Sequence, residues 1–339
     1  MLEAAARNLL DPAILFFVVG LLAGLVRSNL EIPQQVTKFL SLYLLMALGL
    51  KGGATMAVQG VTVGSLVAIL AAVLMAFIVP ILTFLVLRRL VDPFNAAAIA
   101  GTYGSVSAVT FIAGQQFLTK NDIAFGGHMS AAMVFMESPA IIMAVMLVSF
   151  LRRSRNEGAE GGNEASSQGE AVSALPSMRE VLHEAFTDGG HLLLIASLCV
   201  GYIAGESGEA IMKPFVGDLF KGILAFFLLE MGLLVGRQFG ESEFRLEPAL
   251  TVFALVAPVV YAVLALGLAR ALSLSRGDAI LLATLSASAS YIVVPAILRY
   301  AVPEARPGIY FTMALGLTFP FNIIAGIPLY HALSGWVWP

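Results

Sequence analysis

Long apolar stretches recur along almost the whole chain, and they limit its fold more than any other feature. They cover approximately residues 11–26, 33–50, 60–87, 95–118, 128–151, 189–204, 213–235, 247–272, 278–299 and 309–333. A helix of about 20 apolar residues crosses about 30 Å of hydrocarbon, so this set corresponds to about ten transmembrane helices. We therefore predict an all-α polytopic membrane protein.

The overall composition is that of a chain that lies in a lipid bilayer. It is 59% apolar and 12% charged, whereas soluble domains are about 45–50% apolar and about 25% charged. The formal net charge of -3 gives no indication of a nucleic-acid partner. Residues 1–12 include an acid and lack the basic n-region of a signal peptide, so we expect them in the mature protein.

One segment near the middle of the chain differs sharply from the apolar stretches. Residues 152–180 consist mainly of Gly, Ser, Glu and Arg, a composition that cannot bury enough apolar surface to fold. We predict a first five-helix repeat at 1–151, a flexible linker at 152–185 and a second repeat at 186–339. Because five is odd, the second repeat is inverted in the membrane.

The distribution of basic residues predicts the orientation. Arg and Lys are retained in cytoplasmic loops, and the linker begins with Arg152, Arg153 and Arg155. The basic residues at the other span ends favour the same arrangement, with both termini outside and the linker in the cytoplasm. We expect a multi-pass protein of the cell (inner) membrane.

The fourth span of each half shows the closest internal similarity. NAAAIAGTYGSVSA, from Asn95, aligns without gaps on DAILLATLSASASY, from Asp278. Weak similarity between odd-membered halves is typical of inverted-repeat transporters, although two apolar segments can also resemble each other by chance. The alignment pairs Ser105 with Ser288 and Ser107 with Ser290.

These two spans contain residues that form poor helices. Gly and Pro have low helix propensity, and Ser hydroxyls compete for backbone hydrogen bonds. A break in hydrocarbon persists only where it is buried in protein or lines a cavity. The half-helix N-termini would attract an anion and the freed carbonyls would suit Na⁺, unless the small residues only allow close helix packing. The residues concerned are Gly101, Gly104, Ser105, Ser107, Ser286, Ser288, Ser290 and Pro295.

Polar residues inside the spans give further site candidates, since such residues usually face a cavity. Glu137, two residues before Pro139, is our first candidate for a cation ligand or proton carrier, the alternative being a structural carboxylate. For Glu230 we favour a helix-packing or interfacial role. Asn322 could either serve the site or link helices.

The sequence gives no positive sign of enzymatic chemistry. The histidines lack metal-ligand spacing, so we expect no zinc site, and the serines lack the pattern of a hydrolase. No Walker sequence occurs, so we expect transport by an ion gradient or facilitated movement, without a bound cofactor. The histidines are His128, His183, His191 and His331.

Short motifs, in order and spacing, resemble the sodium-dependent bicarbonate transporter superfamily first recognised in cyanobacteria. The resemblance runs from about residue 11 to 333. The motifs are IP at 32–33 followed by LGLKGG, GSVSAVT at 104–110, FMESPA at 135–140, SASASYIVVPAILR at 286–299 and IPLY at 327–330.

This resemblance implies two inverted five-helix repeats with discontinuous crossing helices, divided into core and gate domains and assembled as a homotrimer. It implies Na⁺-coupled bicarbonate uptake, with the substrate where the broken helices cross, and a small PII-like protein as a cytoplasmic regulator. The substrate candidates are Gly104, Ser105, Ser107, Thr110, Ser288, Ser290 and Tyr291, with Pro295 also matching. The ion-binding candidates are Glu137, Ser107, Ser290 and Asn322.

The chain departs from the family pattern at a few of these positions. Glu137 stands where the resemblance suggests Asp, and Tyr291 where cyanobacterial members have an acid; Val293 and Val294 replace small or polar residues. The alternatives are therefore a permease for another small anion or organic carboxylate, which could be proton-coupled through Glu137. From another class, the chain could be a non-transporting membrane sensor or scaffold.

Overall fold

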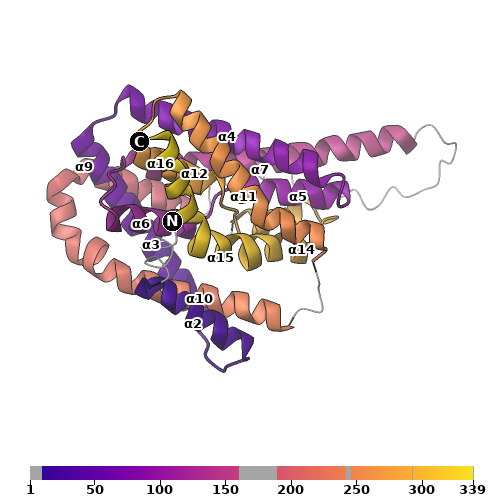
Figure 1. Ribbon diagram of the computed structural model, residues 1–339, viewed down its shortest axis with the longest axis horizontal. Helices are drawn as coiled ribbons and strands as arrows, with labels where there is room; N and C mark the ends of the chain where they lie inside the picture. The colour runs from indigo at the N-terminus through magenta and orange to yellow at the C-terminus, as the bar shows by residue number, and fades with distance from the viewer. Residues whose placement is uncertain (1–9, 160–188, 242–245, 292, 339) are drawn as a thin grey trace.

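The computed structural model describes residues 10–159, 189–241, 246–291 and 293–338, which are helical and contain no β-strand (Figure 1). The first half consists of α2 (Pro12–Leu25), α3 (Gln34–Gln59), α4 (Val63–Leu87), α5 (Pro93–Gly104), α6 (Ala108–Lys120) and α7 (His128–Ala159). The second half begins with α9 (Gly189–Lys213), η1 (Pro214–Asp218), α10 (Leu219–Glu241), α11 (Pro248–Ala271), α12 (Arg276–Ser286) and α13 (Val293–Ala301). It ends with α14 (Pro307–Phe311), η2 (Thr312–Thr318), α15 (Phe319–Phe321), η3 (Asn322–Gly326) and α16 (Ile327–Val337).

Seven helical stretches among the described residues are long and apolar enough to cross a membrane. The helix α2 is not among them, because its 14 residues span only about 21 Å. The two expected spans that begin the second half form one stretch, Gly189–Phe239, with a kink at Gly205, where φ is 59° and ψ is -152°. The structure is thus that of a multi-pass helical membrane protein, but its helices do not separate into ten uninterrupted spans.

The helix α3 is longer than the sequence predicted. We expected a span ending at 50, but α3 continues through Lys51 and ends at Gln59. The glycines there do not terminate it because they lie at close helix contacts: a Cβ on Gly53 would be 2.1 Å from the Leu198 carbonyl oxygen on α9. The termination signal is Gly60, at φ +74°.

Glycines set the distance between the two halves. A Cβ on Gly20 of α2 would lie 2.0 Å from the Leu229 carbonyl oxygen of α10, and one on Gly232 would lie 2.1 Å from the Phe17 carbonyl oxygen. Small residues allow such backbone approach in membranes. As a result α2 packs along α10, and α3 packs along α9 in the same way (Figure 1).

The helix α7 continues to Ala159, past residue 152, where we predicted the start of the linker. Arg152 binds both carboxylate oxygens of Glu304, at 2.9 and 2.7 Å, and also the Ala301 carbonyl oxygen at 3.2 Å. These bonds hold the end of α7 against the segment that follows α13. The rest of the expected linker, 160–185, lies outside the described residues.

Both fourth spans are broken where the sequence predicted. The first break separates α5 from α6 at residues 105–107, and the second separates α12 from α13 between Ser286 and Val293. Pro295 stands in the first turn of α13, where a missing N–H is tolerated.

The residues that open the two broken spans hold equivalent loops of the other half. The Asp278 Oδ1 atom accepts a hydrogen bond from the Gly126 backbone N–H at 2.7 Å, and the Asn95 Oδ1 atom accepts one from the Arg306 N–H, also at 2.7 Å. Asn95 and Asp278 are the residues from which the sequence alignment of the two spans begins. Each broken span is therefore bonded near its first residues to a loop of the other half.

Candidate functional site

The two helix breaks meet and bond to each other. The Ser107 backbone N–H donates to the Ser288 Oγ atom at 2.9 Å, and the Ser290 N–H donates to the Thr102 carbonyl oxygen at 2.9 Å. The Ser288 hydroxyl in turn donates to the Leu285 carbonyl oxygen at 2.8 Å. These bonds satisfy polar backbone groups that each break would otherwise leave unpaired in an apolar environment.

The half-helix that follows the first break begins with a serine cap. The Ser107 Oγ atom accepts hydrogen bonds from the Thr110 backbone N–H at 3.2 Å and from the Thr110 hydroxyl at 2.9 Å. After the second break the Ser290 Oγ atom accepts a longer bond, 3.4 Å, from the Val294 N–H. The N-termini of α6 and α13 thus both lie beside the point where the two breaks meet, and each contributes a partial positive charge there.

A cavity of about 500 Å³ opens beside this meeting point. It lies between α3, the first break, α7, α9, α10, the second break and η2. Apolar side chains form most of its wall, and polar groups are grouped at a few places. The polar and charged lining residues are Gln34, Thr37, Lys38, Ser41, Ser107, Glu137, His191, Glu230, Ser290 and Tyr291.

A carboxylate and an imidazole meet in this cavity. The Glu137 Oε2 atom on α7 lies 3.0 Å from the His191 Nδ1 atom on α9, and only 14% and 5% of the two side chains are exposed. His191 was not among the site residues predicted from the sequence, because the histidines lack metal-ligand spacing. The signal that could have found it is its position within an apolar span, in the first turn of α9, where an ionisable side chain usually faces a cavity.

Glu230 and Lys38 also line the cavity. For Glu230 we favoured a helix-packing or interfacial role from the sequence, and its position in the cavity wall differs from that expectation. Glu230 is buried on α10, whereas Lys38 on α3 remains exposed. The cavity therefore presents two carboxylates, an imidazole and an ammonium group together with serine hydroxyls. Within the described ranges, no group of three His, Cys, Asp or Glu side chains is arranged to hold a metal ion.

Tyr291 closes one side of the cavity. Its side chain is buried, and its ring packs edge-on against Phe319, with centroids 5.2 Å apart. The hydroxyl has the Ser107 side chain as a polar neighbour, without a hydrogen bond of normal geometry. An aromatic ring thus stands at the position where the sequence resemblance suggested an acidic residue.

The remaining predicted substrate residues lie behind the cavity wall. A Cβ on Gly104 would be 2.1 Å from the Pro80 Cγ atom, so this glycine packs α5 against α4. Ser105, Thr110 and Ser288 are buried and do not line the cavity. Thr110 and Ser288 support Ser107 through the hydrogen bonds described above.

Asn322 also lies away from the cavity. Its Nδ2 group donates to the Ala287 carbonyl oxygen at 2.9 Å, and its Oδ1 atom accepts from the Tyr330 hydroxyl at 2.6 Å. Both amide groups are therefore used within the protein. Asn322 thus bonds to the Ala287 carbonyl oxygen, which the second break leaves without a helical partner. From the sequence, Asn322 could either serve the site or link helices, and these bonds correspond to the linking role.

The arrangement as a whole can hold a small anion at the paired half-helix N-termini and a cation among nearby hydroxyl, carbonyl and carboxylate oxygens.

A search of curated proteins finds no match for the chain. The family model described as the Na⁺-dependent bicarbonate transporter superfamily matches residues 12–335, from α2 into α16. The match confirms the resemblance expected from the sequence motifs. The chain belongs to the Na⁺-dependent bicarbonate transporter superfamily.

Proposed function

We propose that this protein is a secondary active transporter that couples Na⁺ to the uptake of bicarbonate. The observation that carries the proposal is the meeting of two broken helices, joined from Ser107 to Ser288, at the edge of a cavity. Broken helices of this kind bind substrate and coupling ion in inverted-repeat transporters. The family match supports the same assignment.

In this proposal the anion lies at the N-termini of α6 and α13, near Ser107 and Ser290. Sodium binds beside it, using hydroxyl and freed carbonyl oxygens together with Glu137. Na⁺ beside the anion lowers the electrostatic cost of bringing either charge into a low-dielectric site, since opposite charges attract more strongly there. Coupled transport follows because each ion strengthens the binding of the other.

The proposed architecture is two inverted five-helix repeats. Its support is the matched packing of α2 on α10 and of α3 on α9, together with the equivalent loop contacts of Asn95 and Asp278. With the N-terminus outside, the cavity lies in the cytoplasmic half, because it is lined by the start of α3 and the start of α9. The described conformation would then be open to the cytoplasm.

Uptake of labelled bicarbonate into proteoliposomes, with and without an inward Na⁺ gradient, tests this function. Sodium-dependent accumulation would support it. Equal uptake with and without the inward Na⁺ gradient would exclude Na⁺ coupling. No flux of bicarbonate or of any other small anion would favour a non-transporting sensor or scaffold.

The Glu137–His191 contact favours one second candidate, a permease driven by protons. A carboxylate 3.0 Å from an imidazole is a pair of groups that can pass a proton from one to the other. Proteoliposomes with an inward proton gradient and no Na⁺ would then accumulate bicarbonate or a small organic carboxylate such as acetate. Under Na⁺ coupling they would accumulate neither.

A further inference from the structure

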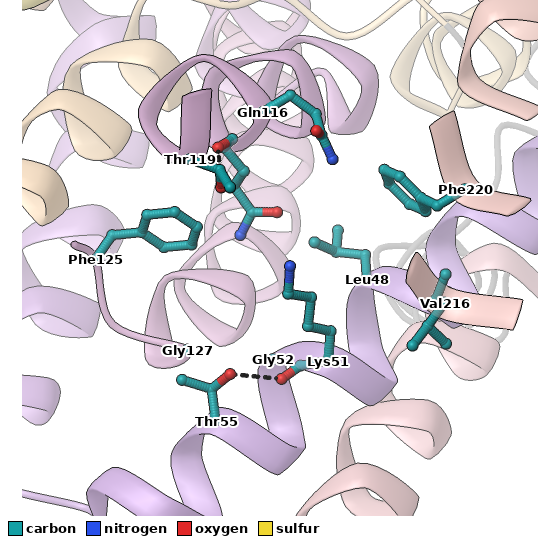
Figure 2. A pocket seen from close by; sticks show the side chains of 12 residues that line it. Leu48, Lys51, Gly52, Thr55, Gln116, Thr119, Phe125, Gly127, Val216 and Phe220 are labelled. Carbon is teal, nitrogen blue, oxygen red and sulfur yellow. Dashed lines mark hydrogen bonds between the residues drawn. The ribbon is translucent and has the colours of Figure 1, made fainter. Parts of the chain in front are cut away.

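A second and smaller pocket lies farther along α3 than the cavity. Its walls come from α3, the second half of α6, the loop before α7 and the segment from η1 to α10 (Figure 2). The lining residues are Ala47, Leu48, Lys51, Gly52, Thr55, Gln115, Gln116, Thr119, Phe125, Gly127, Val216 and Phe220.

The polar groups of this pocket match an anion. Lys51 extends into it from α3, and Gln116 points toward the same space from α6 (Figure 2). The Lys51 ammonium makes no hydrogen bond or ion pair with another residue in the described part of the chain. No Asp or Glu is among the described lining residues, so an ammonium group and two side-chain amides face a space that lacks a counter-charge. The Thr55 and Thr119 hydroxyls donate to the Lys51 and Gln115 carbonyl oxygens, each at 2.8 Å.

Apolar and rigid walls surround these donors. Phe125 lies on one side of Lys51, with Phe220 and Val216 on the other (Figure 2). A Cβ on Gly127 would be 2.4 Å from the Gly52 carbonyl oxygen, so the loop that carries Phe125 is fixed closely against α3. Lys51 itself remains exposed, so these walls limit the contact of its ammonium group with water only in part, and they strengthen its attraction for an anion to that extent.

The pocket is small. Its free volume is about 40 Å³, whereas about 10–15 Å³ on a comparable measure holds one water molecule. The available space therefore suits an anion of a few heavy atoms, such as bicarbonate or acetate.

The pocket and the cavity are both lined by residues of α3 and α6. Ser41 of α3 and Ser107 line the cavity, whereas Lys51 and Gln115 line the pocket. Ten residues of helix separate Ser41 from Lys51, a distance of about 15 Å. The buried side chain of Leu48 faces the pocket, and Leu45, one turn earlier, faces the cavity.

We propose that Lys51, Gln115 and Gln116 form a second binding site for a small oxyanion or carboxylate, farther along α3 and α6 than the cavity. This site collects the transported anion before the anion reaches the Ser107–Ser290 region. The inference rests on the proposed function for the identity of the anion. In the proposed orientation the pocket faces outward.

Uptake kinetics with the Lys51→Gln variant test the collecting role. Loss of a charged hydrogen-bond donor should raise KM for external bicarbonate about tenfold, with kcat within about twofold of wild type. Lys51→Arg keeps the charge and should stay within about threefold of the wild-type KM. The matched control is Lys221→Gln, an exposed lysine next to Phe220 that does not line the pocket; an unchanged KM in Lys51→Gln would overturn the proposal.

A labelling experiment on the purified wild-type protein separates this inference from the proposed function, because it needs no transport. A water-soluble amine-acylating reagent is applied, and peptide mass spectrometry reads the modification of Lys51 against that of Lys221. Bicarbonate or acetate should slow the labelling of Lys51 alone. Protection by acetate in protein that shows no bicarbonate uptake would support the pocket while overturning the proposed substrate. Equal labelling of Lys51 with and without both anions would overturn the pocket.

Discussion

The Glu137 carboxylate lies 3.0 Å from the His191 Nδ1 atom, which joins α7 of the first half to α9 of the second inside the cavity. The predicted linker, residues 152–185, lies between Glu137 and His191 in the sequence. Any movement of one half against the other would therefore change this contact.

Glu137→Gln should reduce bicarbonate uptake about tenfold, because a neutral amide binds a cation more weakly than a carboxylate does and cannot pair with a protonated imidazole. His191→Gln should have a similar effect, and the double variant should be no worse than either single one. Uptake rates in proteoliposomes at matched protein amounts provide the measurement. His331→Gln is the control, because that ring packs against Phe117 away from the cavity; additive losses in the double variant would show that the pair does not act as a unit.

Ser288→Ala should lower the free energy of unfolding by about 1–3 kcal/mol, because it leaves the buried Ser107 N–H without its acceptor. The matched control is Ser286→Ala, which removes a buried hydroxyl that has no hydrogen-bond partner among the described residues. Thermal unfolding in detergent compares the two. Equal losses in both variants would contradict a specific role for the Ser107–Ser288 bond.

Gly104→Ala should destabilise the protein by about 1–3 kcal/mol, since the added methyl group overlaps Pro80. If Gly104 acts through packing alone, the folded fraction of this variant should keep the wild-type KM. The control is Gly267→Ala, where a Cβ meets nothing within 4 Å. A raised KM with unchanged thermal stability would return Gly104 to the substrate site.

Tyr291→Asp should strengthen the dependence of uptake on Na⁺, because it places a carboxylate beside Ser107 at the cavity edge. The measurement is the Na⁺ concentration that gives half-maximal bicarbonate uptake, which should fall. Tyr291→Phe keeps the ring contact with Phe319 and removes only the hydroxyl, so its Na⁺ response should match wild type. An identical Na⁺ response in Tyr291→Asp would place the cation elsewhere.

Both helix breaks and most of the apolar spans were accessible from the sequence, although two expected spans form the single stretch Gly189–Phe239. Apolar runs of membrane-spanning length are a local property, and so is the low helix propensity around Ser105–Ser107 and Ser286–Ser290. Helix ends were less predictable, because glycine, which commonly ends a helix, can also stand inside one where two helices pack closely. Gly53 resembles a helix terminus in sequence but is needed for contact with α9.

The sequence by itself determined a helical membrane protein, its two broken spans and its family. Only the tertiary structure decided which polar side chains share a cavity: it brought His191 to Glu137, placed Gly104 and Asn322 behind the wall, and brought Lys51 beside Gln115 and Gln116. The physical reason is that helix formation depends on neighbours within a few residues, whereas a binding site depends on how distant helices pack. In this chain, glycines at the α2–α10 and α3–α9 contacts set that packing.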